Sequence, residues 1–245
     1  IDYYVKKFGE EDPYLGKKGY FPHRYPRAAY AAMVSYLDER VGQLVALLKE
    51  LGIYDNTLIL FSSDNGPSYA GGTDSPWFKS AGEFSSAYGR GKGFLYEGGI
   101  RVPLIASWPG KVEESSQSEH VSAFWDFLPT LCEVAGVEAP DHVDGISFLP
   151  ELLGHPEQQE HDYLYWEFPS YGGQQALRMG DWKGVRRNIM DGKLEIELYN
   201  LREDSRELHN LAEAHPEMVA RMELLMKEAH VPAELERFQI RQLGD

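Results

Sequence analysis

Apolar residues recur at three- and four-residue steps in the segment that begins at Pro26. The recurring positions share one helical face and are Met33, Leu37, Val41, Leu44, Leu48 and Leu51. Gly52 follows as a left-handed stop. The pattern predicts a long amphipathic helix with one buried face. Residues 1–25 are rich in Gly, Pro, Tyr and Lys without a sustained period, which favours an extended surface loop.

Two continuous apolar runs, 57–61 and 102–108, come after this helix. Continuous rather than alternating hydrophobicity is typical of strands covered on both faces, as in a parallel sheet. A long glycine-rich segment, 66–99, separates the runs, and loops of such length in compact domains are usually functional or disordered. A helix followed by a buried strand is half of a βαβ unit, so the pattern favours an α/β fold.

The hydrophobic pattern changes after about residue 160. Short strand-like runs separated by glycine turns occupy 163–168, 175–179, 182–186 and 194–199, and a helix is predicted over 216–229. A meander followed by a helix predicts a small antiparallel α+β subdomain. We therefore expect a large α/β part over 1–158 and a C-terminal subdomain over 159–245. In the large part, Asp126 is predicted to cap a helix that ends near Gly136.

Composition and charge narrow the possible functions. The formal charge of −15 argues against a general nucleic-acid partner, which requires a basic face for phosphates. No apolar run approaches the roughly 20 residues needed to cross a bilayer, so no membrane span is expected. The single cysteine, Cys132, excludes an internal disulfide framework, and its place on an apolar helix face favours a buried small hydrophobe.

The motif SSDNG follows directly on the first apolar run. Ligands of open α/β sheets bind at the carboxyl ends of strands, where Asp64 and Asn65 would present a carboxylate and an amide oxygen. Hard divalent cations such as calcium prefer oxygen ligands of this kind. The alternative from these five residues alone is an Asx turn that ends a strand without an ion.

A second motif, GRGKG, lies before YEGGIRVP. Glycines allow a backbone to approach an anion closely, and Arg90 and Lys92 offer cationic donors for sulfate or phosphate oxygens. The alternative for Lys92 is a solvated loop lysine. Glu97 and Arg101 are interpreted as a structural ion pair that holds the turn into the next strand.

The order of these motifs closely resembles the C-terminal part of the type I sulfatases, arylsulfatase-like members of the alkaline phosphatase superfamily. The resemblance extends from PRAAYAAMV through SDNG, GKG, YEGGIRVP and DGISFLPELL to GDWKGVR and LYNLREDSRELHNLA. It implies part of an alkaline-phosphatase-like α/β sandwich with a mostly parallel central sheet, plus the small C-terminal antiparallel α+β subdomain.

The resemblance also implies site residues. Asp64 and Asn65 match one pair of the family's calcium ligands, and Lys92 matches the lysine that contacts the substrate sulfate. Arg90 and His23 are further substrate-binding candidates, although the place of His23 just before PRAAYAAMV fits a loop later than the family's PH motif. The implied partners are a sulfated small molecule or glycan and the N-terminal half of the sulfatase domain. The implied location is periplasmic or secreted.

One departure from the family is large. Its nucleophile is a formylglycine made within a C/S-x-P-x-R motif, and this chain contains no such motif. Cys132 precedes Glu133-Val134-Ala135 and does not fit it. We therefore expect the nucleophile upstream of this chain and no activity from the chain in isolation. A phosphomonoesterase or phosphodiesterase of the same superfamily and a non-catalytic sulfatase-like protein that binds glycans remain as alternatives.

Aromatic residues of the C-terminal segment are the last candidates. Trp166, Tyr171 and Trp182 are predicted to reach over the mouth of the active site. The histidines other than His23 show no HxxxH or HxH spacing, and we interpret them as surface or packing residues.

Overall fold

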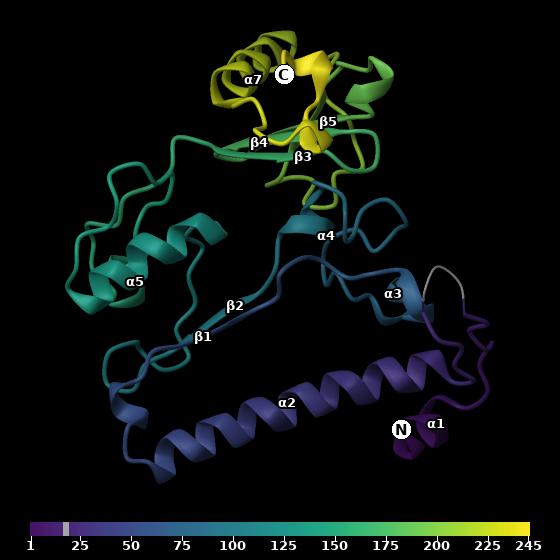
Figure 1. Ribbon diagram of the computed structural model, residues 1–245, viewed down its shortest axis with the longest axis vertical. Coiled ribbons are helices and arrows are strands. Elements are labelled where there is room, and N and C mark those ends of the chain that lie inside the picture. Colours follow the sequence, from purple (N-terminus) through teal and green to yellow (C-terminus); the bar gives the residue numbers. More distant parts are fainter. Residues whose placement is uncertain (17–19) are drawn as a thin grey trace.

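The computed structural model describes residues 1–16 and 20–245, and it has three tiers (Figure 1). A long helix, α2 (Pro26–Glu50), forms the tier at one end. Two strands and several short helices form the middle tier. A four-stranded sheet with one helix forms the tier at the other end.

The N-terminal segment contains a helix that the sequence pattern did not predict, α1 (Asp2–Phe8). Its ring pair Tyr4 and Phe8 is spaced i, i+4 with centroids 5.5 Å apart, which is a favourable helical spacing. Phe8 also packs edge-on against Trp77, at a centroid distance of 5.0 Å. Tertiary aromatic contacts therefore stabilise a short helix where an extended loop was expected.

Helix α2 has the predicted bounds. Pro26 lies in its first turn, where a missing N–H costs little, and Gly52 follows its end with φ 68°. The expected burial differs, because Met33 is 69% exposed and Leu44 is 63% exposed. Among the described residues, the buried positions of the helix, Pro26, Ala28 and Ala31, all lie in its first turns.

Strands β1 (Ile59–Ser62) and β2 (Leu104–Ser107) form at the two predicted apolar runs. They pair antiparallel, with Ser62 opposite Leu104 and Ile59 opposite Ser107. The parallel pairing inferred from continuous hydrophobicity is therefore not found between these two strands. The reason is topological. The chain enters β2 at the same end of the strands at which it left β1, whereas a parallel neighbour requires a crossover connection back to the opposite end.

Short helices fill the middle tier. Helix α5 (Phe127–Ala135) ends as predicted at Gly136, with φ 69°, and Cys132 on it is half-buried rather than buried. The others are single turns: α3 (Ser75–Phe78), α4 (Glu97–Ile100) and α6 (Leu149–Leu152). Two of them belong to the glycine-rich segment: α3 lies in its first half and α4 at its C-terminal end. That segment is therefore ordered by short turns and not by regular strands.

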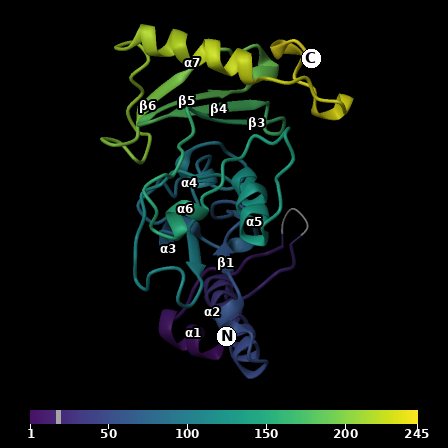
Figure 2. The same cartoon turned by 90° about the vertical axis from the view of Figure 1, so that its left-hand side faces the viewer.

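The C-terminal sheet is a meander of four antiparallel strands in the order of the sequence. The strands are β3 (Leu164–Phe168), β4 (Gln174–Met179), β5 (Trp182–Arg187) and β6 (Glu197–Asn200). Helix α7 (Pro216–Ala229) covers one face, where Leu177 packs against Met222 and Met226 (Figure 2). This agrees with the predicted antiparallel α+β unit.

The other face of the sheet is also buried. Ala176, Val185 and Tyr199 pack there against Leu95 and Tyr96 of the glycine-rich segment. A domain boundary near residue 159 stays a prediction, and any such boundary would be crossed by this apolar contact. No helix among residues 1–16 and 20–245 is both long and apolar enough to cross a bilayer.

Candidate active site

Asp64 and Asn65 lie in the turn directly after β1, as the motif predicted. The side chain of Asn65 donates from Nδ2 to the carbonyl of Gly66 at 2.8 Å, which leaves its Oδ1 atom available as an acceptor. The carboxylate of Asp64 makes no hydrogen bond or ion pair within the described residues. The turn therefore presents an unpaired carboxylate and an amide oxygen side by side.

The Lys92 loop, residues 89–96, and helix α4 after it are joined to this turn by backbone hydrogen bonds. The Gly66 N–H donates to the Gly99 carbonyl at 2.8 Å, and the Lys92 N–H donates to the Pro67 carbonyl at 3.0 Å. A Cβ atom on Gly66 would lie 1.9 Å from the Gly98 carbonyl oxygen, and one on Gly91 would lie 2.4 Å from that of Pro67. The glycines thus permit a backbone approach that brings the two motifs together.

Asp64, Asn65 and Lys92 line one cavity of about 480 Å³. The Lys92 ammonium has no carboxylate partner among the described residues, so it is free to bind an anion. Asp64 and Lys92 do not form an ion pair with each other, and Oδ1 of Asn65 accepts no hydrogen bond within the described residues. The arrangement can hold a cation at the turn and an oxyanion next to it.

The donor set fits a hard cation in kind. A carboxylate and an amide oxygen are calcium ligands, but calcium takes six to eight oxygens in total. Across residues 1–16 and 20–245, no cluster of three or more His, Cys, Asp or Glu side chains could hold a metal ion. Asp64 and Asn65 can thus supply part of a coordination shell.

Arg90 and His23 are not brought to this cavity. The Arg90 guanidinium donates to the Glu207 carbonyl at 2.8 Å and lies 3.7 Å from the centroid of the Tyr96 ring. Its charge is thus used to join the Lys92 loop to the C-terminal unit. The backbone of His23 pairs with Tyr14 in an isolated bridge, and its Nδ1 atom accepts from the Tyr25 N–H at 3.1 Å.

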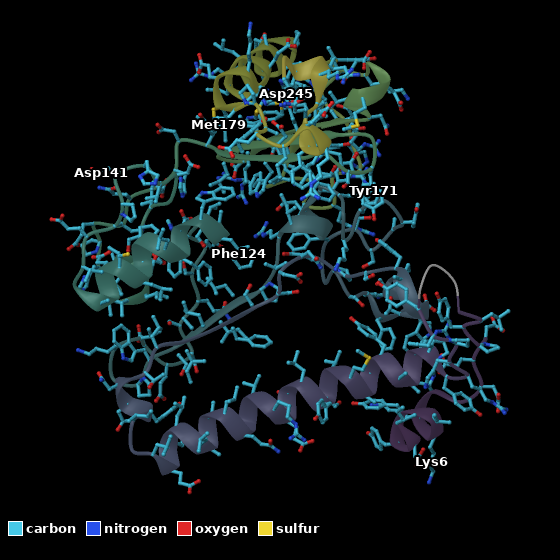
Figure 3. All side chains as sticks on the ribbon, viewed as in Figure 1. Lys6, Phe124, Asp141, Tyr171, Met179 and Asp245 are labelled. Carbon is cyan, nitrogen blue, oxygen red and sulfur yellow. The ribbon has the colours of Figure 1, made fainter. Side chains whose placement is uncertain are left out.

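Two of the three predicted aromatic residues, Trp166 and Tyr171, line the cavity. Tyr171 lies between the C-terminal sheet and the middle tier (Figure 3), with its ring centroid 5.3 Å from that of Phe94. Trp182 packs elsewhere, against His215 and the α7 core. Phe124, also on the cavity, projects from the segment before α5 (Figure 3).

A buried ionic cluster joins the C-terminal sheet to helix α4, which directly follows the Lys92 loop. Lys183 of β5 is fully buried and contacts Glu97 at 2.7 Å and Glu207 at 3.0 Å, while Glu97 also pairs with Arg101 at 3.4 Å as predicted. Burial opposes ionisation of Glu97, but the charge and hydrogen bond of Lys183 outweigh it and lower the pKa. Burial and the nearby Glu97 charge raise the pKa of Glu207. The Lys183 ammonium thus stabilises the charged form of Glu97 more than that of Glu207.

Sequence reasoning missed this cluster and a second one around Asp126. Lys183 and Glu207 carry no local motif, and their spacing along the chain gives no signal. Asp126 was predicted as a simple helix cap, but its carboxylate accepts from the N–H groups of Ala123 and Ile146. It also contacts Nε2 of His161 at 2.8 Å, so His161 is a partner of a buried acid.

Two family models match the chain. The model described as sulfatase matches residues 1–137, and the model described as N-sulphoglucosamine sulphohydrolase, C-terminal, matches residues 88–231. A sulfatase of Schizosaccharomyces pombe is 31% identical over 227 residues, covering 78% of this chain and 40% of the relative. Human arylsulfatase A is 34% identical over 168 residues, covering 66% of this chain and 31% of the relative.

Solved structures show the same similarity. The crystal structure of Ps i-CgsB superposes with a TM-score of 0.71 at 27% identity, covering 93% of this chain and 46% of that one. The phosphonate monoester hydrolase of Agrobacterium radiobacter gives a TM-score of 0.63 at 26% identity, covering 84% and 42%. The chain spans less than half the length of each of these relatives. Its fold is of the alkaline-phosphatase-like type, and the chain belongs to the sulfatase family.

Proposed function

We propose that this chain supplies part of the active site of a sulfuric ester hydrolase that cleaves a carbohydrate or aryl sulfate. The observation that carries the proposal is the common cavity of Asp64, Asn65 and Lys92, in which a carboxylate, an amide oxygen and an ammonium are all unpaired within the described residues.

The roles follow from charge. Lys92 binds a peripheral sulfate oxygen and offsets the negative charge that builds up as the ester bond breaks. Asp64 and Asn65 hold one side of a divalent cation, and calcium fits their oxygens. When bound, such an ion polarises the sulfate and neutralises its oxygens. The backbone bonds between the two motifs fix the backbone of Lys92 relative to the cation ligands.

The nucleophile is supplied from outside this chain. No C/S-x-P-x-R sequence occurs among its 245 residues, and the half-buried Cys132 lies on α5 and is not among the residues lining the cavity. We infer that a formylglycine and the remaining cation ligands come from a further segment of polypeptide. The chain in isolation is therefore expected to be inactive.

A sulfated carbohydrate is the favoured substrate class. Aromatic faces next to the oxyanion site, such as Trp166 and Tyr171, suit the apolar face of a sugar ring or an aryl group. Among the similar proteins are an N-acetylglucosamine-6-O-sulfatase of Bacteroides thetaiotaomicron and Ps i-CgsB in complex with k-i-k-neocarrahexaose. A periplasmic or secreted location stays a prediction from the family, testable by cell fractionation.

The test uses the coding sequence that surrounds this chain. The longer polypeptide is produced and assayed against an aryl sulfate, an aryl phosphate and a panel of sulfated oligosaccharides, with and without a calcium chelator. Calcium-dependent release of inorganic sulfate that is lost in Lys92→Ala is the expected result.

Other outcomes would contradict the proposal. Faster turnover of the phosphate would favour a phosphoesterase, the alternative supported by the similarity to the phosphonate monoester hydrolase. Binding of sulfated glycans without turnover of any ester would favour a non-catalytic sulfatase-like protein.

A further inference from the structure

Gln174 connects the C-terminal sheet to the loop that carries Lys92. It is the first residue of β4, and it is 1% exposed. Its Nε2 atom donates to the Gly93 carbonyl at 2.8 Å, and its Oε1 atom accepts from the Leu95 N–H at 3.4 Å. One side-chain amide thus bonds to the backbone of Gly93, which follows Lys92, and to that of Leu95, on the other side of Phe94.

The contact is reinforced by the turn before β4. Tyr171 in that turn has φ 53°, which is uncommon for a residue with a side chain, and it is 62% exposed. A Cβ atom on Gly93 would lie 2.6 Å from the Tyr171 ring, so the ring rests directly on the Lys92 loop. The β3–β4 turn therefore contacts this loop through a ring and a buried amide.

We propose that Gln174 is a positioning residue, which fixes the Lys92 ammonium relative to the oxyanion by holding the backbone at Gly93 and Leu95. The inference rests on the proposed function, since it assigns to the C-terminal sheet a part in the same reaction. Lys92 has a flexible side chain, so its backbone must be fixed if the ammonium is to meet the sulfate in one geometry. Misplacement of a reacting group by about 1 Å can cost on the order of 100-fold in rate.

Gln175 provides a matched control. It is the next residue of the same strand, has the same side chain and is also 1% exposed. Because successive side chains of a strand face opposite sides, it faces away from the loop and bonds to the Tyr165 hydroxyl at 2.7 Å and to Arg186 at 3.0 Å. A general loss of stability would follow from substitution at either position.

The experiment is a double-mutant cycle in the longer polypeptide, with Gln174→Met, Gln175→Met and Lys92→Ala. Methionine keeps the side-chain volume and removes the hydrogen bonds. We expect Gln174→Met to lower kcat/KM by on the order of 10- to 100-fold, and Gln175→Met to leave it within about threefold. In the Lys92→Ala background, Gln174→Met should have almost no further effect on the residual rate, because its influence acts through that ammonium.

Amide hydrogen exchange on the same proteins separates this inference from the proposed function. Exchange at Leu95 should become faster in Gln174→Met and not in Gln175→Met. An unchanged rate of amide exchange at Leu95 would overturn the positioning role even in an active sulfatase. So would an equal loss of kcat/KM from Gln174→Met in the wild-type and the Lys92→Ala backgrounds. If the wild-type polypeptide hydrolyses no sulfate ester, the proposed function fails, while the exchange at Leu95 still decides whether Gln174 holds the loop.

Discussion

Individual side chains at the end of β1 carry the chemistry proposed for the chain. Asp64 is the only carboxylate that lines the cavity together with Lys92 among the described residues. Its carboxylate is exposed and unpaired within the described residues, so it is free to bind a cation. The effect of removing its charge is therefore the most direct measure of its role.

Asp64→Asn keeps the shape of the side chain and removes the charge. In the longer polypeptide we expect kcat/KM for a sulfate ester to fall by about 100-fold or more, and calcium to bind more weakly in titration calorimetry. The control is Asp55→Asn in the turn before β1, which lines no part of the cavity. Equal losses in both variants would exclude Asp64 as a cation ligand.

Gly66→Ala tests the close approach of the two loops. The new methyl group would meet the Gly98 carbonyl oxygen at 1.9 Å, and because both groups belong to backbones, the loops must separate. We expect destabilisation of several kcal/mol, measured by urea unfolding of the chain. Gly42→Ala in the middle of α2 meets nothing within 4 Å and should instead stabilise by about 1 kcal/mol. A neutral Gly66→Ala would contradict the described approach.

Between elements, the ionic cluster of Lys183, Glu97 and Glu207 joins β5 to α4 and to the loop after β6. Breaking a buried ion pair leaves an uncompensated charge, which costs more than the pair itself contributes. The cluster is therefore a strong determinant of how the Lys92 loop sits on the C-terminal sheet, although it takes no part in the proposed chemistry.

Lys183→Met should destabilise the chain by about 3–5 kcal/mol near neutral pH. Without the ammonium, the pKa of Glu97 rises above its ordinary value, and a group with a raised pKa in the folded state favours folding at low pH. The deficit should therefore shrink as the pH falls from about 8 to about 5. The control Arg202→Met removes an exposed ion pair with Asp181 and should cost about 1 kcal/mol or less. A deficit that grows on acidification would refute the cluster.

Over the whole molecule, α2 and β2 expose several large apolar side chains. Met33 and Leu37 on the helix and Ile105 on β2 are each more than half exposed. Contiguous exposed apolar surface marks an interaction site or promotes aggregation. This agrees with the expectation that a further part of the sulfatase domain covers this side, which stays a proposal.

The residues 1–245 on their own are expected to self-associate through this surface. The double substitution Leu37→Lys/Leu44→Lys should increase the monomeric fraction in analytical ultracentrifugation and reduce binding of a hydrophobic dye. Gln43→Lys/Ala46→Lys adds the same charge to the same helix and should change neither quantity as much. A monomer that binds no dye before any substitution would contradict the prediction.

Local sequence features predicted most of the elements and the two cavity motifs. The bounds of α2 and α5 followed from apolar periodicity with a glycine stop, the bounds of α7 were also predicted, and Glu97 and Arg101 were interpreted as an ion pair at the turn before the next strand. Helix α1 was missed because its stability comes from aromatic contacts with residues far along the chain. Arg90 was expected to bind substrate because a cation in a glycine loop looks the same in a sequence whether it faces an anion or a tyrosine ring.

The sequence by itself determined the family, the order of the elements and the residue types of the candidate site, since these depend on local pattern and on motifs that stand in a fixed order. Only the tertiary structure decided that β1 and β2 run antiparallel, that Lys92 shares a cavity with Asp64, and that Gln174 and Lys183 hold its loop. Those outcomes depend on contacts between residues tens of positions apart. Such contacts are set by how the elements pack in three dimensions, and local sequence patterns do not encode that packing directly.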